Sequence, residues 1–396
     1  YPAQHSEKLT MATFSLEDES PPSTFPEPGQ TLYQMGLYLD INTHTLYGST
    51  ILDTVNTTGK PLDELWFTLY PNAFRYQKGT PAPLNAYYAG FDAGWLEING
   101  CKVNGQEVEY ILDGVSLKVV LPHDILPSRD IKVEMQWQSR VPKVAYRYGV
   151  NDGVYMLGNF YPILNVFSEE GWHISYNSLF GDPFCFNCAD YLVRLNIPET
   201  YQMVSTGSNI QAVAEDNGRV SYLIEAKNVR DFCLAVMYDY NELIQEIKQV
   251  TIKCYVPGNN TDMARDILQE SGDILNHYSC TLGSYPYPEF KVVFVPMKGF
   301  HGMEYSGLIF LREEFLAKGS DQERGLFILA HEIAHQWWYC MVGNDQLKEP
   351  WLDEGLANWS AYKYLEKYKG KSPPPAANLK GGINLAREMC DIYSTR

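Results

Sequence analysis

Two histidines and a glutamate stand close together late in the chain, in the order His331-Glu332-Ile333-Ala334-His335. The residues around this segment are largely apolar, which indicates a buried helix. Histidines four positions apart on a helix lie on the same face, so both imidazoles can reach one metal ion. Neutral imidazoles suit zinc, and Glu332 can act as a general base for a water beside that metal.

A third ligand is expected from Glu354, which opens another helical segment beyond His335. A helix, loop and helix of that length can fold back and deliver the carboxylate, while a fourth position stays open for water. The alternative is a helix with two surface histidines, but the apolar surroundings argue against it because buried histidines need polar partners. We therefore predict one Zn2+ per chain, held by His331, His335 and Glu354.

The motif and its surroundings resemble the aminopeptidase N family, which includes the leukotriene hydrolase type. In that family a glutamate follows H-E-x-x-H after eighteen residues, as Glu354 does here within residues 351–357. Residues 301–305, His-Gly-Met-Glu-Tyr, resemble the family's G-x-M-E-N exopeptidase signature, and Tyr-Pro-Tyr-Pro at 285–288 is also typical. The resemblance extends over nearly the whole chain, and in the front half it includes residues 42–48, 65–74 and 180–189.

This resemblance implies a zinc enzyme that removes N-terminal amino acids from peptides. Glu304 would bind the free α-amine of the substrate, with Gly302 and Met303 of the signature beside it. A carboxylate suits a cationic amine, and a fixed distance from zinc would select the first peptide bond. The alternative for Glu304 is a solvated loop charge.

The chain departs from the family pattern at three positions, two of them in the signature. His301 replaces the first Gly and Tyr305 replaces the Asn, which bears on local geometry and specificity. Asn159 stands where family members carry a glutamine that touches the substrate amine, and its alternative is an ordinary turn residue. His301 is interpreted as structural.

The elements that must position these residues fall into two parts. Up to about residue 248 the chain predicts strands, with alternating apolar residues in 131–137 and 191–197. Helices are then predicted at about 263–278, 322–340 and 353–368. This indicates two domains, 1–248 and 249–396, with a Ser/Pro/Glu-rich leader at 15–28. By resemblance the fold is multidomain α+β: an N-terminal antiparallel β saddle or sandwich, then a thermolysin-like mixed α/β catalytic domain, truncated at its C-terminal side.

Composition limits the partners. The formal net charge of -17 disfavours nucleic acid, and no apolar run is long enough to span a membrane. The expected partners are peptides with a free N-terminus. Because the chain starts at Tyr1, we expect an extracytoplasmic or membrane-anchored protein that has lost a terminal segment, with a cytoplasmic location as the alternative.

Cys185 and Cys188 are interpreted as core thiols or one local disulfide, with a metal half-site or a redox pair as alternatives.

Two other functions compete with an aminopeptidase. One is a catalytically weak or inactive peptide-binding module of the same fold, against which an intact Glu332 argues. The other is a hydrolase of a non-peptide bond, such as the lipid epoxide opened by one family branch.

The family's oxyanion-stabilising tyrosine lies farther past the glutamate ligand than this chain runs. Tyr393 is the late candidate for that role, and we expect the chain to be part of a longer protein.

Overall fold

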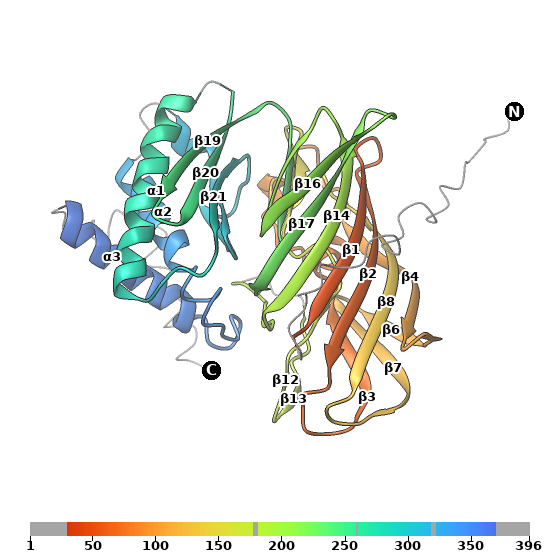
Figure 1. Cartoon of the computed structure of the whole chain (residues 1–396). Helices are drawn as coiled ribbons and strands as arrows, with labels where there is room; N and C mark the ends of the chain where they lie inside the picture. The colour runs from red at the N-terminus through yellow and green to blue at the C-terminus, as the bar shows by residue number, and fades with distance from the viewer. Residues whose placement is uncertain (1–29, 177–180, 259, 318–321, 370–396) are drawn as a thin grey trace, which may run out of the picture.

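The computed structural model describes residues 30–176, 181–258, 260–317 and 322–369. The leader at 15–28 and Tyr393 lie outside these residues. A part made of β-sheets and a smaller part that carries the long helices stand side by side (Figure 1). The structure is thus mostly β-sheet with few helices, as the sequence predicted for its front half.

The largest sheet in the β-rich part has eight strands in the order β16-β17-β14-β1-β2-β8-β4-β5. Its neighbours are antiparallel except β1 and β14, which are parallel, so the predicted all-antiparallel arrangement is wrong at that one pair. The strands are β16 (Ser208–Glu215), β17 (Arg219–Val229), β14 (Ala189–Pro198), β1 (Leu32–Asp40), β2 (Thr45–Val55), β8 (Asp130–Arg140), β4 (Trp95–Val103) and β5 (Gln106–Glu107).

Two predicted strands in this sheet differ in how they are buried. β8 alternates as predicted. Its odd-numbered residues are buried and the residues between them are more exposed: Ile131, Val133, Met135 and Trp137 against Lys132, Glu134 and Gln136. β14 was expected to have one wet face, but Leu192 and Asn196 on that face are buried too. Leu192 packs with Leu32, and Asn196 hydrogen-bonds neighbouring polar side chains. A central strand covered on both faces does not keep a simple alternation.

Smaller sheets complete the β-rich part. Their strands are β15 (Gln202–Ser205), β18 (Leu234–Met237), β10 (Val154–Leu157) and β9 (Tyr148–Asn151) in one sheet, β11 (Ile163–Leu164), β3 (Leu62–Thr68), β7 (Ser116–Ile125) and β6 (Tyr110–Asp113) in another, and the pair β12 (Phe167–Ser168) and β13 (Gly171–Trp172). Short 3-10 helices lie at η3 (Tyr70–Phe74) and η4 (Leu84–Ala86).

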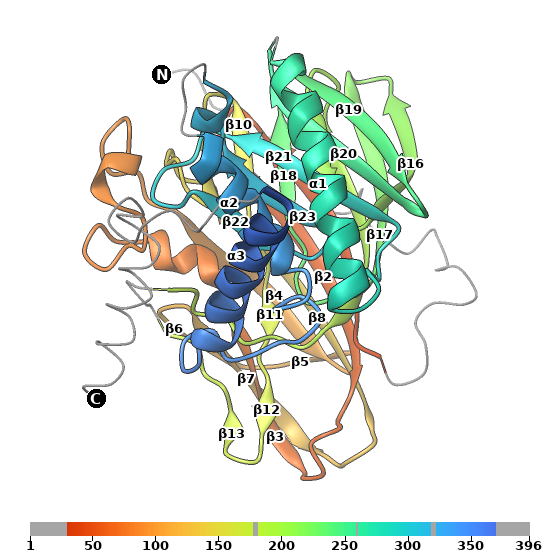
Figure 2. The same cartoon turned by 90° about the vertical axis from the view of Figure 1, so that its left-hand side faces the viewer.

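The second part is a five-stranded mixed sheet covered by helices on the face that points away from the β-rich part (Figures 1 and 2). Its strands, in spatial order, are β19 (Tyr240–Ile247), β20 (Val250–Pro257), β21 (Glu289–Val295), β23 (Leu308–Arg312) and the edge strand β22 (Gly302–Tyr305). Its helices are α1 (Thr261–Thr281), η5 (Glu313–Leu316), α2 (Gln322–Ala334), η6 (Trp351–Gly355) and α3 (Leu356–Lys369).

The helix that carries the histidine motif is shorter than predicted. α2 ends at Ala334, not near residue 340. The next turn is wider, since the amides of Cys340, Met341 and Val342 each donate to a carbonyl five residues back. η6 is also a π-helix. Turns of this wide type are rare and occur often at functional sites.

The five-stranded sheet has a separate core on each face. Ile252, Cys254 and Val292 pack against the helices, while Tyr255 and Val293 pack against β10 and β18 of the β-rich part. The predicted domain boundary at 248 falls in the turn between β19 and β20, which pair in one sheet. A division into domains 1–248 and 249–396 therefore stays a proposal, and pairing favours placing β19 with the second part.

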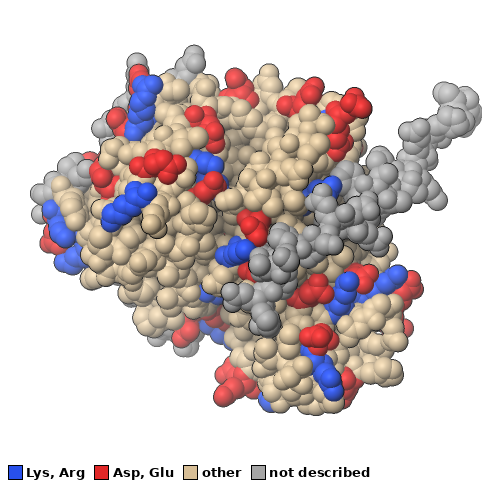
Figure 3. All heavy atoms as spheres, viewed as in Figure 1, with Lys and Arg blue, Asp and Glu red and all other residues tan. Residues whose placement is uncertain are grey.

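The described part of the chain contains no helix long and apolar enough to span a membrane. On the face shown in Figure 3, acidic and basic side chains are interspersed rather than gathered into a basic patch.

Candidate active site

The three predicted metal ligands come together between α2 and η6. The Nε2 atoms of His331 and His335 lie 3.1 Å apart. Nε2 of His331 is 3.3 Å from Oε2 of Glu354, and Nε2 of His335 is 4.0 Å from Oε1 of the same carboxylate. One atom from each side chain therefore lies within 4.8 Å of the others, which is close enough for a shared metal ion.

The wide turn after α2 orients the second histidine. Nδ1 of His335 lies 3.0 Å from the carbonyl oxygen of Trp338. If Nδ1 carries the proton and donates it there, the lone pair of Nε2 faces the cluster, which is the arrangement that metal-bound histidines show. Burial alone would lower the pKa of His335. The carboxylates of Glu304, Glu354 and Glu332 outweigh that effect and raise the pKa to about 10.

The third predicted ligand, Glu354, is held in a charged state. Burial would raise the pKa of Glu354, but a hydrogen bond from His331 and the charges of both histidines outweigh it and lower the pKa to about 2. The neighbouring Asp353 is anchored, because Gln346 and Asn344 donate to its two oxygens at 2.8 and 3.0 Å.

The candidate base is packed tightly against the edge strand. Glu332 is buried, and a Cβ atom on Gly302 would lie 2.2 Å from Oε1 of Glu332. Residue 302 can therefore only be glycine while Glu332 keeps this position. Burial and the nearby Glu304 carboxylate raise the pKa of Glu332 well above its usual value.

Strand β22 separates the signature residues by face. Gly302 and Glu304 face the cluster, since Glu304 lies with Glu332 and His335 in a second group of close donor atoms. Met303 packs on the opposite face, in the core between the two parts, so a substrate contact from it would come from its backbone. The pKa of Glu304 is raised to about 8, chiefly because its side chain is buried.

Asn159 is buried with a left-handed backbone, φ 52°, and neither atom of its amide has a hydrogen-bond partner among the described residues. Buried amides are normally paired. The adjacent Gly158 lies against the hydroxyl of Tyr305, which follows Glu304 on β22. Asn159 is therefore close in structure to the signature strand, and its buried amide has no hydrogen-bond partner among the described residues.

Sequence reasoning missed three polar residues of this site. The side-chain amide of Gln346 donates to Glu304 at 3.2 Å and also to Asp353. It therefore links the candidate for amine binding, Glu304, to the turn η6 that carries Glu354. Arg147 and Asp182 form a buried ion pair, and the Asp182 charge contributes to raising the pKa of Glu304 and Glu332. No motif marks these residues, since they are far apart in sequence.

The remaining predicted residues are placed as follows. His301 lies against the guanidinium groups of Arg312 and Arg324, which agrees with its structural interpretation. Cys185 and Cys188 are both free thiols, so the local disulfide is not formed.

Comparison with known proteins finds similarity in the second part. Residues 267–386 match the peptidase family M1 domain. The chain is 26% identical over 201 residues to aminopeptidase M1-B of Oryza sativa subsp. japonica, covering 46% of this chain and 23% of that protein. It is 33% identical over 136 residues to aminopeptidase N of Rattus norvegicus, covering 32% of this chain and 13% of that protein.

These matches cover part of the chain, less than the nearly complete resemblance expected from the motifs, and the chain spans less than a quarter of those relatives.

Proposed function

We propose that this chain, an aminopeptidase N family member over the part that matches, is the zinc-holding portion of a metallopeptidase that removes N-terminal amino acids from peptides. The observation that carries the proposal is the convergence of His331, His335 and Glu354 beside two further buried carboxylates, Glu332 and Glu304. On this view the second part is a thermolysin-like catalytic domain. An extracytoplasmic or membrane-anchored location, with a cytoplasmic one as the alternative, is part of this proposal.

The donor set fits a zinc ion. Two imidazoles and one carboxylate leave a fourth position open, which is the composition of catalytic zinc sites. Three carboxylates gather around His335 and raise its pKa, so the centre of the cluster favours a cation. When bound, zinc would polarise the scissile carbonyl and lower the pKa of a water.

Glu332 is the proposed base. Its carboxylate is held next to the ligand cluster by packing against Gly302. Its raised pKa suits a group that takes a proton from the attacking water and then gives it to the leaving amine. A carboxylate that stayed at its ordinary pKa would be a weaker base and would take the proton from the water less readily.

Glu304 is the proposed site for the substrate's α-amine. It is buried on a rigid edge strand, and the amide of Gln346 fixes its carboxylate relative to η6. A cationic amine placed there would favour the ionised form of Glu304 and pair with it at a constant distance from the proposed metal ligands, which selects the first peptide bond. The unpaired amide of Asn159 is the proposed second contact.

The proposal is tested with fluorogenic amino-acid amides on the intact chain and on Glu332→Gln. The glutamine variant should keep its zinc and its fold and lose turnover, because an amide cannot take the proton. Undiminished turnover in the variant would contradict the role of Glu332. A zinc-containing parent with no turnover, in the chain and in any longer form, would instead support the peptide-binding module, while turnover of a lipid epoxide alone would support the other hydrolase.

A further inference from the structure

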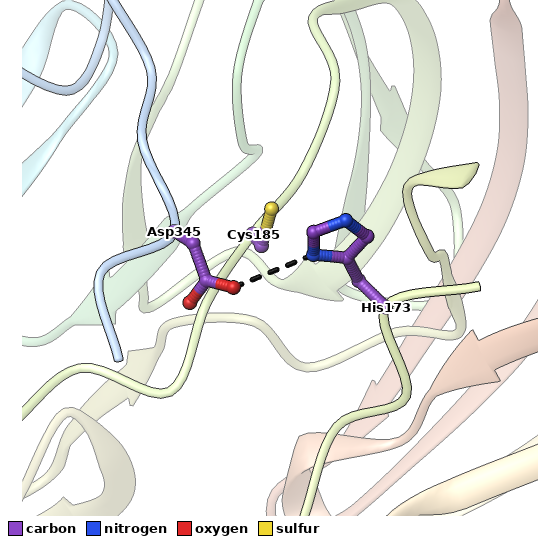
Figure 4. Close-up of side chains that lie close together, drawn as sticks. All are labelled: His173, Cys185 and Asp345. Atoms are coloured by element: carbon purple, nitrogen blue, oxygen red, sulfur yellow. Dashed lines mark hydrogen bonds and ion pairs between the residues drawn. The ribbon is translucent and has the colours of Figure 1, made fainter. Parts of the chain in front are cut away.

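A second group of metal-type side chains lies outside the site just described. Asp345 is far in sequence from His173 and Cys185, yet one donor atom from each of the three side chains lies within 4.8 Å of the others. Figure 4 shows His173 and Asp345 turned toward each other with Cys185 beside them. Nδ1 of His173 lies 3.4 Å from Oδ2 of Asp345. All three are partly buried.

The backbone around this group is fixed by hydrogen bonds between the two parts of the molecule. The backbone amide of Gln346 donates to the backbone carbonyl of Phe184 at 3.1 Å, and these two residues are the direct neighbours of Asp345 and Cys185. Arg230 donates to the carbonyls of Phe186 and Tyr339, at 2.7 and 2.6 Å. The segments that carry Cys185 and Asp345 are therefore held side by side without help from their side chains.

Asp345 divides its carboxylate between two tasks. Oδ1 accepts from the amides of Leu347 and Lys348, at 3.2 and 3.0 Å, and so shapes the turn. Oδ2 is turned toward His173, and its other neighbour is the ammonium of the exposed Lys348 at 3.7 Å. Oδ2 of Asp345 therefore remains to bind a metal ion on the side that faces His173.

The donor set indicates the class of metal. Imidazole nitrogen, thiolate sulfur and carboxylate oxygen together suit zinc and its divalent neighbours, whereas calcium and magnesium prefer oxygen alone. Burial raises the pKa of the Cys185 thiol to about 11. A metal ion bound there would therefore displace a proton from sulfur, so its affinity should increase with pH.

We propose that His173, Cys185 and Asp345 bind a second divalent transition-metal ion of the zinc class, which ties the β-rich part to the loop at 343–350. This loop carries Gln346, whose amide contacts Glu304. A metal ion at the second site would therefore hold the loop that orients the proposed amine-binding carboxylate. The site itself does not depend on the proposed peptidase function, because none of its ligands belongs to the first cluster.

The test uses cobalt ions added to the intact, metal-free chain in a non-thiol reductant. Cobalt bound to a thiolate gives a ligand-to-metal absorption band in the near ultraviolet, and the first cluster has no cysteine. We expect this band in the intact chain and in His335→Ala, which removes a ligand of the first cluster only. We expect it to be lost in Cys185→Ser and retained in Cys188→Ser, a matched control three residues away.

Two further variants keep the test independent of folding in any one of them. His173→Gln should weaken cobalt binding at this site by more than about 10-fold. Asp345→Asn keeps the turn-forming oxygen and should also weaken it. An intact chain that binds cobalt without a thiolate band, or a band that survives in Cys185→Ser, would overturn the proposal. An intact chain that shows the cobalt–thiolate band but has no peptidase activity would count against the proposed function and not against this second metal site.

Discussion

At the scale of single residues, the proposed base depends on how closely Gly302 approaches it. The space beside the Glu332 carboxylate is filled by the backbone of β22, so a methyl group at residue 302 has no room. The carboxylate would have to move away from the position that faces the metal ligands.

Gly302→Ala should therefore lower kcat/KM by about 10²-fold, the usual effect of displacing a reacting group by about 1 Å, while zinc content stays unchanged. Steady-state kinetics and metal analysis on the same sample check this. Gly100→Ala is the matched control, because a Cβ there meets no atom within 4 Å. Equal loss in both variants would show a general effect on folding.

Glu304 gives a second prediction at this scale. Glu304→Gln removes the charge that would pair with the substrate amine, a charged hydrogen bond worth about 1.5–3 kcal/mol. We expect kcat/KM for free-amine substrates to fall by about 10- to 100-fold. N-acetylated analogues should be poor substrates for the parent enzyme. If the parent cleaves blocked and free peptides equally well, Glu304 does not enforce exopeptidase action.

His301 makes stability depend on pH. Burial, and then the charges of Arg324 and Arg312, lower its pKa to about 4. A folded-state pKa below the unfolded value of about 6.5 means that the unfolded chain binds a proton first as pH falls. The contribution of His301 to stability is therefore fully present above about pH 6.5 and is lost as pH falls towards 4.

His301→Gln should accordingly flatten the decrease in the free energy of unfolding between pH 6.5 and 4, measured by chemical denaturation at several pH values. The effect is reduced by the partial exposure of the ring. An unchanged slope would contradict the shifted pKa.

At the scale of elements, contacts between the turn after α2 and the end of β22 hold the proposed base next to the proposed amine site. Gln336 in the turn after α2 donates to the carbonyl of Tyr305 at 3.0 Å and accepts from the amide of Gly307 at 2.8 Å. One buried side chain thus satisfies two backbone groups next to Glu304.

Gln336→Leu would leave both backbone groups buried without partners, at about 1–3 kcal/mol each. We expect the free energy of unfolding to fall by about 2–5 kcal/mol, measured by urea denaturation. The same change at the exposed Gln211 should have little effect. A loss below 1 kcal/mol at Gln336 would mean that the two elements are held by apolar packing alone.

At the scale of the whole molecule, the net charge of -17 argues against polyanion partners. We expect no tight, salt-sensitive binding of DNA or heparin by the intact chain. Binding isotherms at low and physiological salt check this, and a strong decrease of affinity with salt would contradict it.

The sequence by itself determined the candidate metal ligands and the base. The four-residue spacing of His331 and His335 predicts that both point to one side of a helical turn, and Glu354 can reach them only if the chain folds back. It also determined the strand-rich front half, because alternation along strands such as β8 is a local pattern.

Only the tertiary structure decided the rest. Gln346, Arg147 and Asp182 join the site through contacts between segments far apart in the chain, and local periodicity carries no information about such contacts. The two-sided burial of β14 and the shorter α2 were missed for the same reason: neighbouring layers and the wide turn at Trp338 override local preference. The group of His173, Cys185 and Asp345 exists only because the two parts of the molecule pack together.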